Sequence, residues 1–342
     1  MPGVRTFLTP LPRGHAELGS FVRGPPLLGS CTTAPAHRKA HIVTHTDLTG
    51  VLVALVTPFT DDGSEIDAAV LEAHVDRLIR EGAHGLVAAG STGEFTTLTV
   101  AERKQLTELV VKTAAGRVPV VAGTGALTTH DAVDLAAHAA QAGASALMVV
   151  PPFYDAVDLR TLKELLREIY AASRLPIVFY NIPGASGLSL APAEIASLAE
   201  VEGVRYLKDT SGDAVALTEL LQSHSDRITT FNGWDTLTFY GIAAGAKGAV
   251  WGATNFIPEL SRQLWDALAV DADLVRGRDL WAKIYPICRL LEQHNYAAAV
   301  KTGLELTGYP AGPPRRPFAL LEGDARAELA ALLRAAGVEV TG

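Results

Sequence analysis

The sequence predicts an α/β protein, a (β/α)8 TIM barrel followed by a C-terminal helical extension. Short apolar runs alternate with amphipathic stretches between residues 50 and 257, and this alternation builds a parallel sheet. The repeating part also has the length of a closed eight-stranded barrel. The alternative is an open doubly wound sheet, which typically carries a Gly-x-Gly-x-x-Gly turn after its first strand. Here the first strand leads into Thr57-Pro58-Phe59 instead.

The composition is that of a large globular protein. The chain has 342 residues, of which 48% are hydrophobic and 19% are charged. Its net charge of -8 argues against nucleic acid or an anionic membrane as a partner. No apolar run reaches the roughly 18 residues typical of a transmembrane helix. Cys31 and Cys288 lie far apart and form no Cys-x-x-Cys pair, so we expect no disulfide framework, no zinc site and a cytoplasmic location.

The first 47 residues differ from the rest of the chain. They contain Pro, Gly, Arg and His without a period, and Glu17 is the only acidic residue before Asp47. The basic, acid-poor composition resembles a transit peptide, but no apolar core suggests a secretory signal. We expect residues 1–47 to be a disordered N-terminal extension. The barrel is then expected over 48–257 and a C-terminal helical domain over 258–342.

Eight strands are predicted from short apolar runs that end at Gly, Pro or polar residues. The first, 51–57, is continuously apolar and ends at Pro58, as expected for a strand covered on both faces. The others are expected at 85–89, 118–122, 146–150, 176–180, 204–208, 227–231 and 248–251.

Helices are predicted where apolar residues recur at helical spacing. The stretch 66–81 is typical, because it places apolar residues on one face and ends at Gly82. Further helices are expected at 100–115, 131–142, 159–172, 192–200, 213–223 and 236–244. After residue 257 the pattern is purely helical, with amphipathic stretches at 259–268, 274–293, 296–307 and 324–335.

Functional residues of a barrel are expected at the carboxyl ends of its strands. The strand 204–208 ends in Lys208, and the two-residue period puts Val204, Tyr206 and Lys208 on one face. Burial of an ammonium is costly, so the alternative is a lysine that leans out into solvent. The other strand ends carry Thr57-Pro58, Gly90-Ser91-Thr92-Gly93-Glu94, Thr124, Pro152-Phe153-Tyr154, Tyr180-Asn181, Asn232-Gly233-Trp234-Asp235 and Gly252-Ala253-Thr254-Asn255.

These residue types suit Schiff-base chemistry. A desolvated lysine can lose its proton near neutral pH and attack a ketone. The backbone N–H groups and hydroxyls of the turn Gly90-Ser91-Thr92-Gly93 can hold a substrate carboxylate. Tyr180 can act as the general acid/base. Ser91 or Thr92, together with Tyr154, can relay its proton.

Each residue also has a purely structural alternative. A Gly-Ser-Thr-Gly turn is common after a strand, and Tyr180 can be a strand-end aromatic whose hydroxyl reaches water. Tyr154 beside Phe153 can be an interface pair, and Asp235 can be the N-cap of the next helix. The histidines show no metal-binding spacing, so we predict no metal site. The joint occurrence of these residues on one rim favours chemistry.

Together the motifs resemble those of the dihydrodipicolinate synthase / N-acetylneuraminate lyase family. The resemblance runs from about residue 50 to the C-terminus and includes Arg316-Pro317. It is carried by Gly90-Ser91-Thr92-Gly93-Glu94, Pro152-Phe153-Tyr154, Tyr180-Asn181-Ile182-Pro183 with Gly187, Lys208-Asp209-Thr210-Ser211-Gly212-Asp213 and Asn232-Gly233-Trp234-Asp235.

The resemblance implies a class I aldolase or lyase that uses no metal or organic cofactor and commonly forms a homotetramer, a dimer of dimers. Lys208 would form a Schiff base with pyruvate or another 2-keto acid, and an aldehyde would be the second substrate. Tyr180 would be the acid/base, and the turn Ser91-Thr92-Gly93 would bind the carboxylate. Tyr154 would reach into a neighbouring subunit's site and complete a hydroxyl relay.

Two sets of specificity residues are incomplete. Ala185 stands where dihydrodipicolinate synthases proper have an arginine that binds the aldehyde's carboxylate. Of the polyol-binding positions of the sialic acid lyases, Asp235 matches, but Thr236 replaces an acid and Gly252 replaces a serine. A 2-keto-3-deoxy sugar-acid aldolase or dehydratase therefore remains open. So do a dihydrodipicolinate synthase proper and a non-catalytic keto-acid-binding homologue. A metal-dependent barrel aldolase is disfavoured, because His, Asp and Glu do not cluster at the strand ends.

Overall fold

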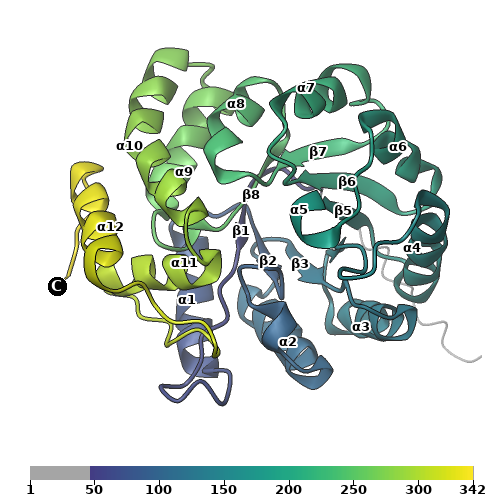
Figure 1. Ribbon diagram of the computed structural model, residues 1–342, viewed down its shortest axis with the longest axis horizontal. Coiled ribbons are helices and arrows are strands. Elements are labelled where there is room, and N and C mark those ends of the chain that lie inside the picture. Colours follow the sequence, from purple (N-terminus) through teal and green to yellow (C-terminus); the bar gives the residue numbers. More distant parts are fainter. Residues whose placement is uncertain (1–46, 342) are drawn as a thin grey trace, which may run out of the picture. The chain divides into compact units, whose positions relative to one another are not determined.

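The computed structural model describes residues 47–341 of the chain (Figure 1). The disordered extension predicted over residues 1–47 falls, apart from Asp47, outside the described residues. No helix of the described residues is long and apolar enough to cross a membrane.

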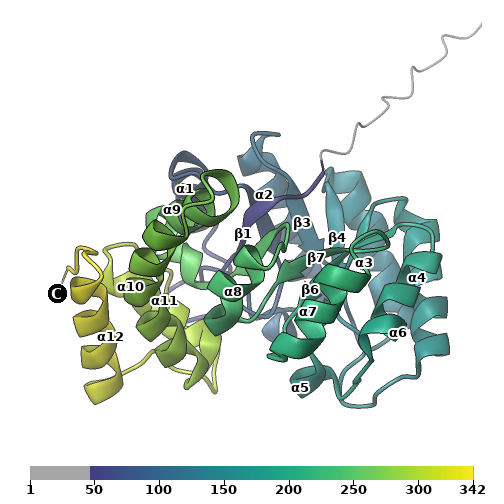
Figure 2. The same ribbon diagram turned by 90° about the horizontal axis from the view of Figure 1, so that it is seen from above.

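Eight parallel strands form a closed barrel in which each strand pairs with its neighbours in the sequence, and β8 pairs back with β1. The predicted fold class is therefore confirmed. The strands are short and almost entirely buried, because helices cover their outer faces (Figures 1 and 2). They are β1 (Gly50–Ala54), β2 (Gly85–Ala88), β3 (Val120–Gly123), β4 (Ala146–Val149), β5 (Ile177–Asn181), β6 (Val204–Asp209), β7 (Thr229–Asn232) and β8 (Gly248–Trp251).

Helices follow the strands at the predicted places, and local signals define several of their starts. Thr99 and Glu102 form a capping box at the start of one helix, and the Asp213 carboxylate caps another. The helices between strands are α1 (Ala68–Arg80), α2 (Val100–Ala114), α3 (Thr129–Ala142), α4 (Leu159–Ser173), α5 (Pro183–Ser186), α6 (Pro192–Ser197), α7 (Ala214–Ser223) and α8 (Thr238–Ala243). The single turn α5 was not predicted, because four residues are too few to show a helical period.

Four further helices follow β8, as the sequence predicts. They are α9 (Pro258–Trp265), α10 (Leu274–Glu292), α11 (Tyr296–Leu306) and α12 (Gly323–Ala335). One apolar cluster joins Val51 of β1 and Trp251 of β8 to buried residues of these helices, such as Ile284, Val300 and Leu333. The C-terminal helices are thus packed on the side of the barrel where β1 and β8 meet, and they can contribute to a site at the strand ends.

Candidate active site

One cavity of about 410 Å³ lies at the carboxyl ends of the strands and collects most of the predicted site residues. It is lined by Ser91, Thr92, Tyr180, Lys208, Asp235 and Gly252. These residues come from loops and strand ends that lie far apart in the sequence. The barrel brings them together because all its strands run in the same direction.

Lys208 and Tyr180 are direct neighbours in this cavity. They are paired in the register of β5 and β6, so both side chains point to the same side of the sheet. The Lys208 Nζ lies 4.1 Å from the centroid of the Tyr180 ring. Lys208 is only 5% exposed, so the alternative of a solvent-facing lysine is wrong. Among residues 47–341, no carboxylate lies within 4.0 Å of its Nζ in an ion pair.

A glycine on the neighbouring strand end makes room for the lysine. A Cβ added to Gly233 would lie 2.6 Å from the Lys208 Cε and 2.7 Å from its Cγ. Any side chain at position 233 would therefore displace the lysine from its path into the cavity. Gly233 belongs to the motif Asn232-Gly233-Trp234-Asp235, but only the packing shows why a glycine is needed there.

The turn after β2 contributes two residues with unpaired backbone N–H groups, Ser91 and Thr92, to the cavity lining. The Gly93 N–H donates to the Gly90 carbonyl and the Glu94 N–H to the Ser91 carbonyl, each over 3.0 Å. Within the described residues, the N–H groups of Ser91 and Thr92 have no such partner. Adjacent unpaired N–H groups form an anion-binding concavity. Gly93 does not line the cavity. Instead, its carbonyl accepts a hydrogen bond of 2.7 Å from the Thr57 hydroxyl.

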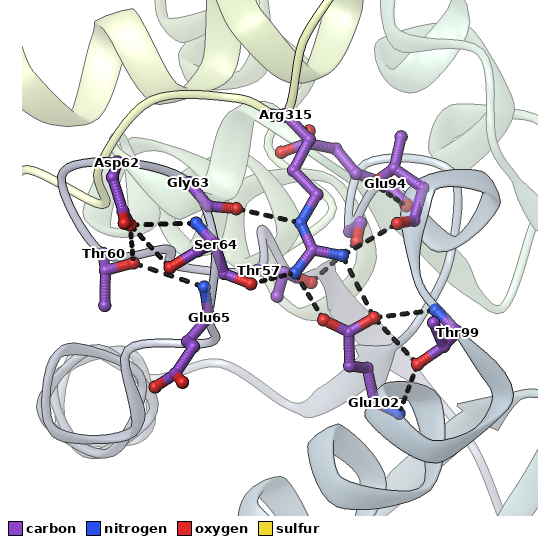
Figure 3. A network of polar contacts seen from close by, with 12 residues as sticks. Thr57, Thr60, Asp62, Gly63, Ser64, Glu65, Glu94, Thr99, Glu102 and Arg315 are labelled. Carbon is purple, nitrogen blue, oxygen red and sulfur yellow. Dashed lines mark hydrogen bonds and ion pairs between the residues drawn. The ribbon is translucent and has the colours of Figure 1, made fainter.

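Glu94, the last residue of this turn, connects it to the C-terminal region (Figure 3). Its side chain is buried, and its backbone adopts a left-handed conformation with φ 56°. The Lys301 Nζ of α11 lies 2.8 Å from one Glu94 carboxylate oxygen. The Arg315 N–H donates to the other over 2.9 Å. Two residues from beyond the barrel therefore hold the end of the turn that follows β2.

The Arg315 guanidinium extends the same network to α2 and to the loop after β1 (Figure 3). It forms a bidentate pair with Glu102 and donates to the carbonyls of Gly63, Ser64 and Thr97. The hydrogen bond with Arg315 lowers the pKa of Glu102 to about 2. The sequence gives no indication of these contacts, because Arg315 lies more than two hundred residues from Gly63 and Glu102 along the chain.

A tyrosine and a carboxylate of the cavity lining form a close pair. The Tyr296 hydroxyl donates to the Asp235 carboxylate over 2.6 Å. Burial raises the pKa of Asp235 to about 7, although the hydrogen bond from Tyr296 opposes this shift. Asp235 begins a 3-10 turn over Asp235–Leu237 and does not cap it, so the N-cap alternative is wrong. No strand-end pattern predicts Tyr296, because it begins α11, a helix beyond the barrel.

Tyr154 lies apart from the other predicted catalytic residues. It does not line the cavity of its own chain. Its side chain is 95% exposed, and its φ of 82° is unusual for a residue with a Cβ. The adjacent Phe153 instead packs edge-on against Phe95, with 5.8 Å between ring centroids. The structure therefore brings together Lys208 and Tyr180 but leaves Tyr154 facing outward.

The chain is also similar in sequence to known proteins. A sequence model of the dihydrodipicolinate synthetase family matches residues 47–336. A 4-hydroxy-tetrahydrodipicolinate synthase from Methanothrix thermoacetophila is 35% identical over 281 residues, which cover 82% of this chain and 94% of that protein.

Solved structures agree with the sequence relationship. The dihydrodipicolinate synthase of Acinetobacter baumannii, in complex with pyruvate, has a TM-score of 0.81 and 30% identity over 85% of this chain and 100% of that chain. YagE from E. coli K12, a protein of the dihydrodipicolinic acid synthase family also in complex with pyruvate, has a TM-score of 0.80 and 29% identity. The match with YagE covers 85% of this chain and 99% of that chain.

Proposed function

Because the chain belongs to the dihydrodipicolinate synthetase family, we propose that it is a lyase or synthase that forms a Schiff base between Lys208 and pyruvate or a 2-keto-3-deoxy sugar acid. The observation that carries the proposal is the position of the Lys208 amine. It lies in a cavity at the strand ends, 4.1 Å from the Tyr180 ring centroid, with unpaired N–H groups of Ser91 and Thr92 on the same cavity.

In this mechanism the neutral Lys208 amine attacks C2 of the 2-keto acid, and the carbinolamine loses water to form an iminium ion. In aldol cleavage the C4 hydroxyl loses its proton and the C3–C4 bond breaks. The aldehyde departs, and the electron pair enters an enamine. Protonation at C3 and hydrolysis then release pyruvate and the free amine. In condensation the enamine attacks an aldehyde, and in dehydration it expels the C4 hydroxyl as water after C3 has lost a proton.

The remaining roles follow from the same geometry. The Tyr180 hydroxyl moves the proton of the carbinolamine. The N–H groups and hydroxyls of Ser91 and Thr92 hold the C1 carboxylate. Tyr154, exposed and outside its own cavity, contributes its hydroxyl to the site of a neighbouring subunit. This role requires an oligomer, for which we propose a homotetramer, in the cytoplasm.

Dihydrodipicolinate synthase proper is the second candidate, since curated relatives carry that activity in their names. That reaction takes an aldehyde with its own carboxylate, and the position of the arginine that would bind it is the exposed Ala185 of α5. For this reason we place the 2-keto-3-deoxy sugar acids first. A non-catalytic keto-acid-binding homologue is disfavoured, because a binder does not need a buried amine next to a phenol.

The test is reductive trapping. Incubation with pyruvate and borohydride should attach one reduced pyruvate to Lys208, as located by peptide mass spectrometry. Lys208→Ala should abolish the adduct, and Lys283→Ala, an exposed lysine of α10 outside the cavity, should not. A wild-type protein that gains no adduct at Lys208 is not a Schiff-base enzyme.

A further inference from the structure

A second cavity, of about 390 Å³, lies at the end of the barrel opposite to Lys208. Its lining includes Arg205 and Thr229 from the starts of β6 and β7, and Thr49 and Lys247, which directly precede β1 and β8. Because all strands of the barrel run in the same direction, their amino ends meet around one opening, away from the carboxyl ends that hold Lys208. We call this hollow the amino-end cavity.

The amino-end cavity is positively charged. Of the described residues that line it, Arg205, Arg227 and Lys247 are basic and only Asp47 is acidic. The cavity around Lys208 has the reverse balance, with one lysine and three carboxylates, and the whole chain has a net charge of -8. Three cations gathered in a hollow of an acidic protein raise the local concentration of anions.

Two of these cations have no carboxylate partner. Among the residues that the structure describes, neither Arg205 nor Lys247 has a carboxylate oxygen within 4.0 Å, and both side chains are exposed. Arg227 is paired with Glu200 over 3.3 Å, and Glu200 also binds Lys163 over 2.9 Å. Since Glu200 does not line the cavity, the positive charge there is not compensated from within.

Neutral donors lie beside the cations. The Tyr206 hydroxyl accepts from the Leu48 N–H and donates to the Asp47 carboxylate, each over 3.4 Å, which is longer than an ordinary hydrogen bond of these types. Burial raises the pKa of Tyr206, so the phenol keeps its proton at neutral pH. The lining therefore offers an oxyanion both charged and neutral donors.

The charge and size of the cavity restrict its occupant. Asp47 joins the described part of the chain to residues 1–46, which carry five Arg and Lys residues and a single acid, Glu17. A segment of that charge is repelled by a basic cavity. A long polyanion is repelled by the net charge of the whole chain, and a volume of about 390 Å³ suits a small molecule. The occupant expected from these properties is a small anion.

We propose that the amino-end cavity is a binding site for a phosphate group, present as free phosphate or on a small phosphorylated molecule, whose oxygens are held by Arg205 and Lys247. A guanidinium presents paired N–H donors that match two phosphate oxygens, and an ammonium adds a point charge. The three outer oxygens of a phosphate monoester can engage both cations and the Tyr206 hydroxyl together. The inference goes beyond the proposed function and does not depend on it, since these three side chains do not line the cavity of Lys208.

The test is isothermal titration calorimetry of the full chain at low ionic strength. The probes are inorganic phosphate, glycerol 3-phosphate and glucose 6-phosphate, with glucose as the uncharged control. We expect a Kd below about 1 mM for at least one phosphate probe, weaker binding as salt screens the charges, and no binding of glucose. A lower Kd for an ester than for inorganic phosphate assigns the site to a phosphorylated molecule, and the reverse order assigns it to free phosphate.

Variants at the two ends of the barrel locate the bound phosphate. Arg205→Gln and Lys247→Gln should each raise the Kd roughly tenfold or more, the scale of a hydrogen bond to a charged group, and leave borohydride trapping of pyruvate on Lys208 unchanged. Arg278→Gln removes an exposed arginine of α10 outside the cavity and should bind as wild type does. Lys208→Ala should also retain phosphate binding.

Three outcomes would overturn the site. The first is a full chain that binds none of the phosphate probes at millimolar concentration. The second is a folded protein with both Arg205→Gln and Lys247→Gln that binds phosphate as tightly as wild type. The third is phosphate binding that is lost in Lys208→Ala, because the phosphate would then occupy the cavity at the carboxyl ends of the strands.

Discussion

The Lys208 ammonium lies against the face of the Tyr180 ring, 4.1 Å from its centroid. The two residues are paired across neighbouring strands, Tyr180 on β5 and Lys208 on β6. Both are almost completely buried, at 3% and 5% exposure. The aromatic face stabilises the amine when it is charged, and the hydroxyl at the edge of the ring is available for proton transfer.

Tyr180→Phe tests this division of roles. The ring remains, so the variant should still trap pyruvate on Lys208, but turnover should fall roughly 10²-fold or more because a positioned acid/base is lost. Trapping by mass spectrometry and turnover by pyruvate release are measured on the same preparation. Unchanged turnover would remove Tyr180 from the mechanism.

Tyr154 can be tested by mixing two inactive variants. In a mixed pair, the Tyr154→Phe subunit retains Lys208 and receives the intact Tyr154 of a Lys208→Ala partner. Co-expression should therefore restore up to about a quarter of the wild-type activity, since random pairing across a two-fold interface gives half mixed pairs with one intact site each. If Tyr154 acts within its own chain, the mixture stays inactive.

The ion pair between Glu94 and Lys301 should stabilise the fold and position the turn after β2. Lys301 is fully buried, and burial lowers its pKa to about 8. Lys301→Met leaves the buried Glu94 carboxylate without its countercharge, which should lower the free energy of unfolding by about 3–5 kcal/mol and raise the KM for pyruvate.

The matched control is Lys301→Met combined with Glu94→Gln, which removes both charges. It should recover most of the stability measured by denaturant unfolding, because no buried charge is left uncompensated. If Lys301→Met is as stable as wild type, the ion pair between Glu94 and Lys301 does not stabilise the fold.

His74 on α1 should make the fold sensitive to acid. Its Nε2 lies 2.9 Å from the Asn255 side-chain oxygen, and Arg77 approaches its Nδ1, so the bonded form is the neutral ring. Burial, and then the charge of Arg77, lower the pKa of His74 from 6.5 to about 4. Between these values the unfolded chain binds a proton that the folded chain does not.

The contribution of His74 to the free energy of unfolding is therefore lost as the pH falls from 6.5 to 4, and amounts to about 3 kcal/mol. His74→Gln keeps a donor for Asn255 and should flatten the pH dependence over this interval, as measured by chemical denaturation. An identical slope in both proteins would contradict the assignment.

The pH dependence of Schiff-base trapping should report the ionisation of Asp235, which lines the same cavity as Lys208. Burial raises the pKa of Asp235 to about 7. The hydrogen bond from Tyr296 and the charge of Lys208 lower this pKa, whereas the charge of Glu292 raises it. Cys288 of α10 also interacts electrostatically with Asp235. The ratio of 2-keto-3-deoxy-D-gluconate trapping to pyruvate trapping should rise with pH through about 7, as the carboxylate becomes an acceptor for the substrate hydroxyl.

Tyr296→Phe removes a hydrogen bond that lowers the pKa of Asp235, so the midpoint of this rise should move to higher pH. Asp235→Asn should abolish the rise altogether. If the midpoint of the pH dependence is the same in Tyr296→Phe and in wild type, Asp235 is not the group whose ionisation controls trapping.

Much of the fold could be predicted from the sequence, because short apolar strands and amphipathic helices leave local patterns. The strand predicted at 248–251 matches β8, and the helix predicted at 296–307 matches α11 within one residue. Lys208 and Tyr180 could also be predicted, since both stand at strand ends and a closed parallel barrel gathers those ends. Their direct pairing is a matter of register, which the structure supplies.

The sequence by itself determined the class of fold and the positions of Lys208, Tyr180 and the turn Gly90-Ser91-Thr92-Gly93 at the strand ends. Each of these is encoded within a few residues by period, turn chemistry or motif. Only the tertiary structure decided which side chains complete the cavity. In the sequence, Gly252 indicates the loss of a polar side chain. In the structure, Tyr296 of α11 fills the space that a side chain at position 252 would need. Such a pairing depends on the packing of segments far apart in the chain, and no local pattern records it.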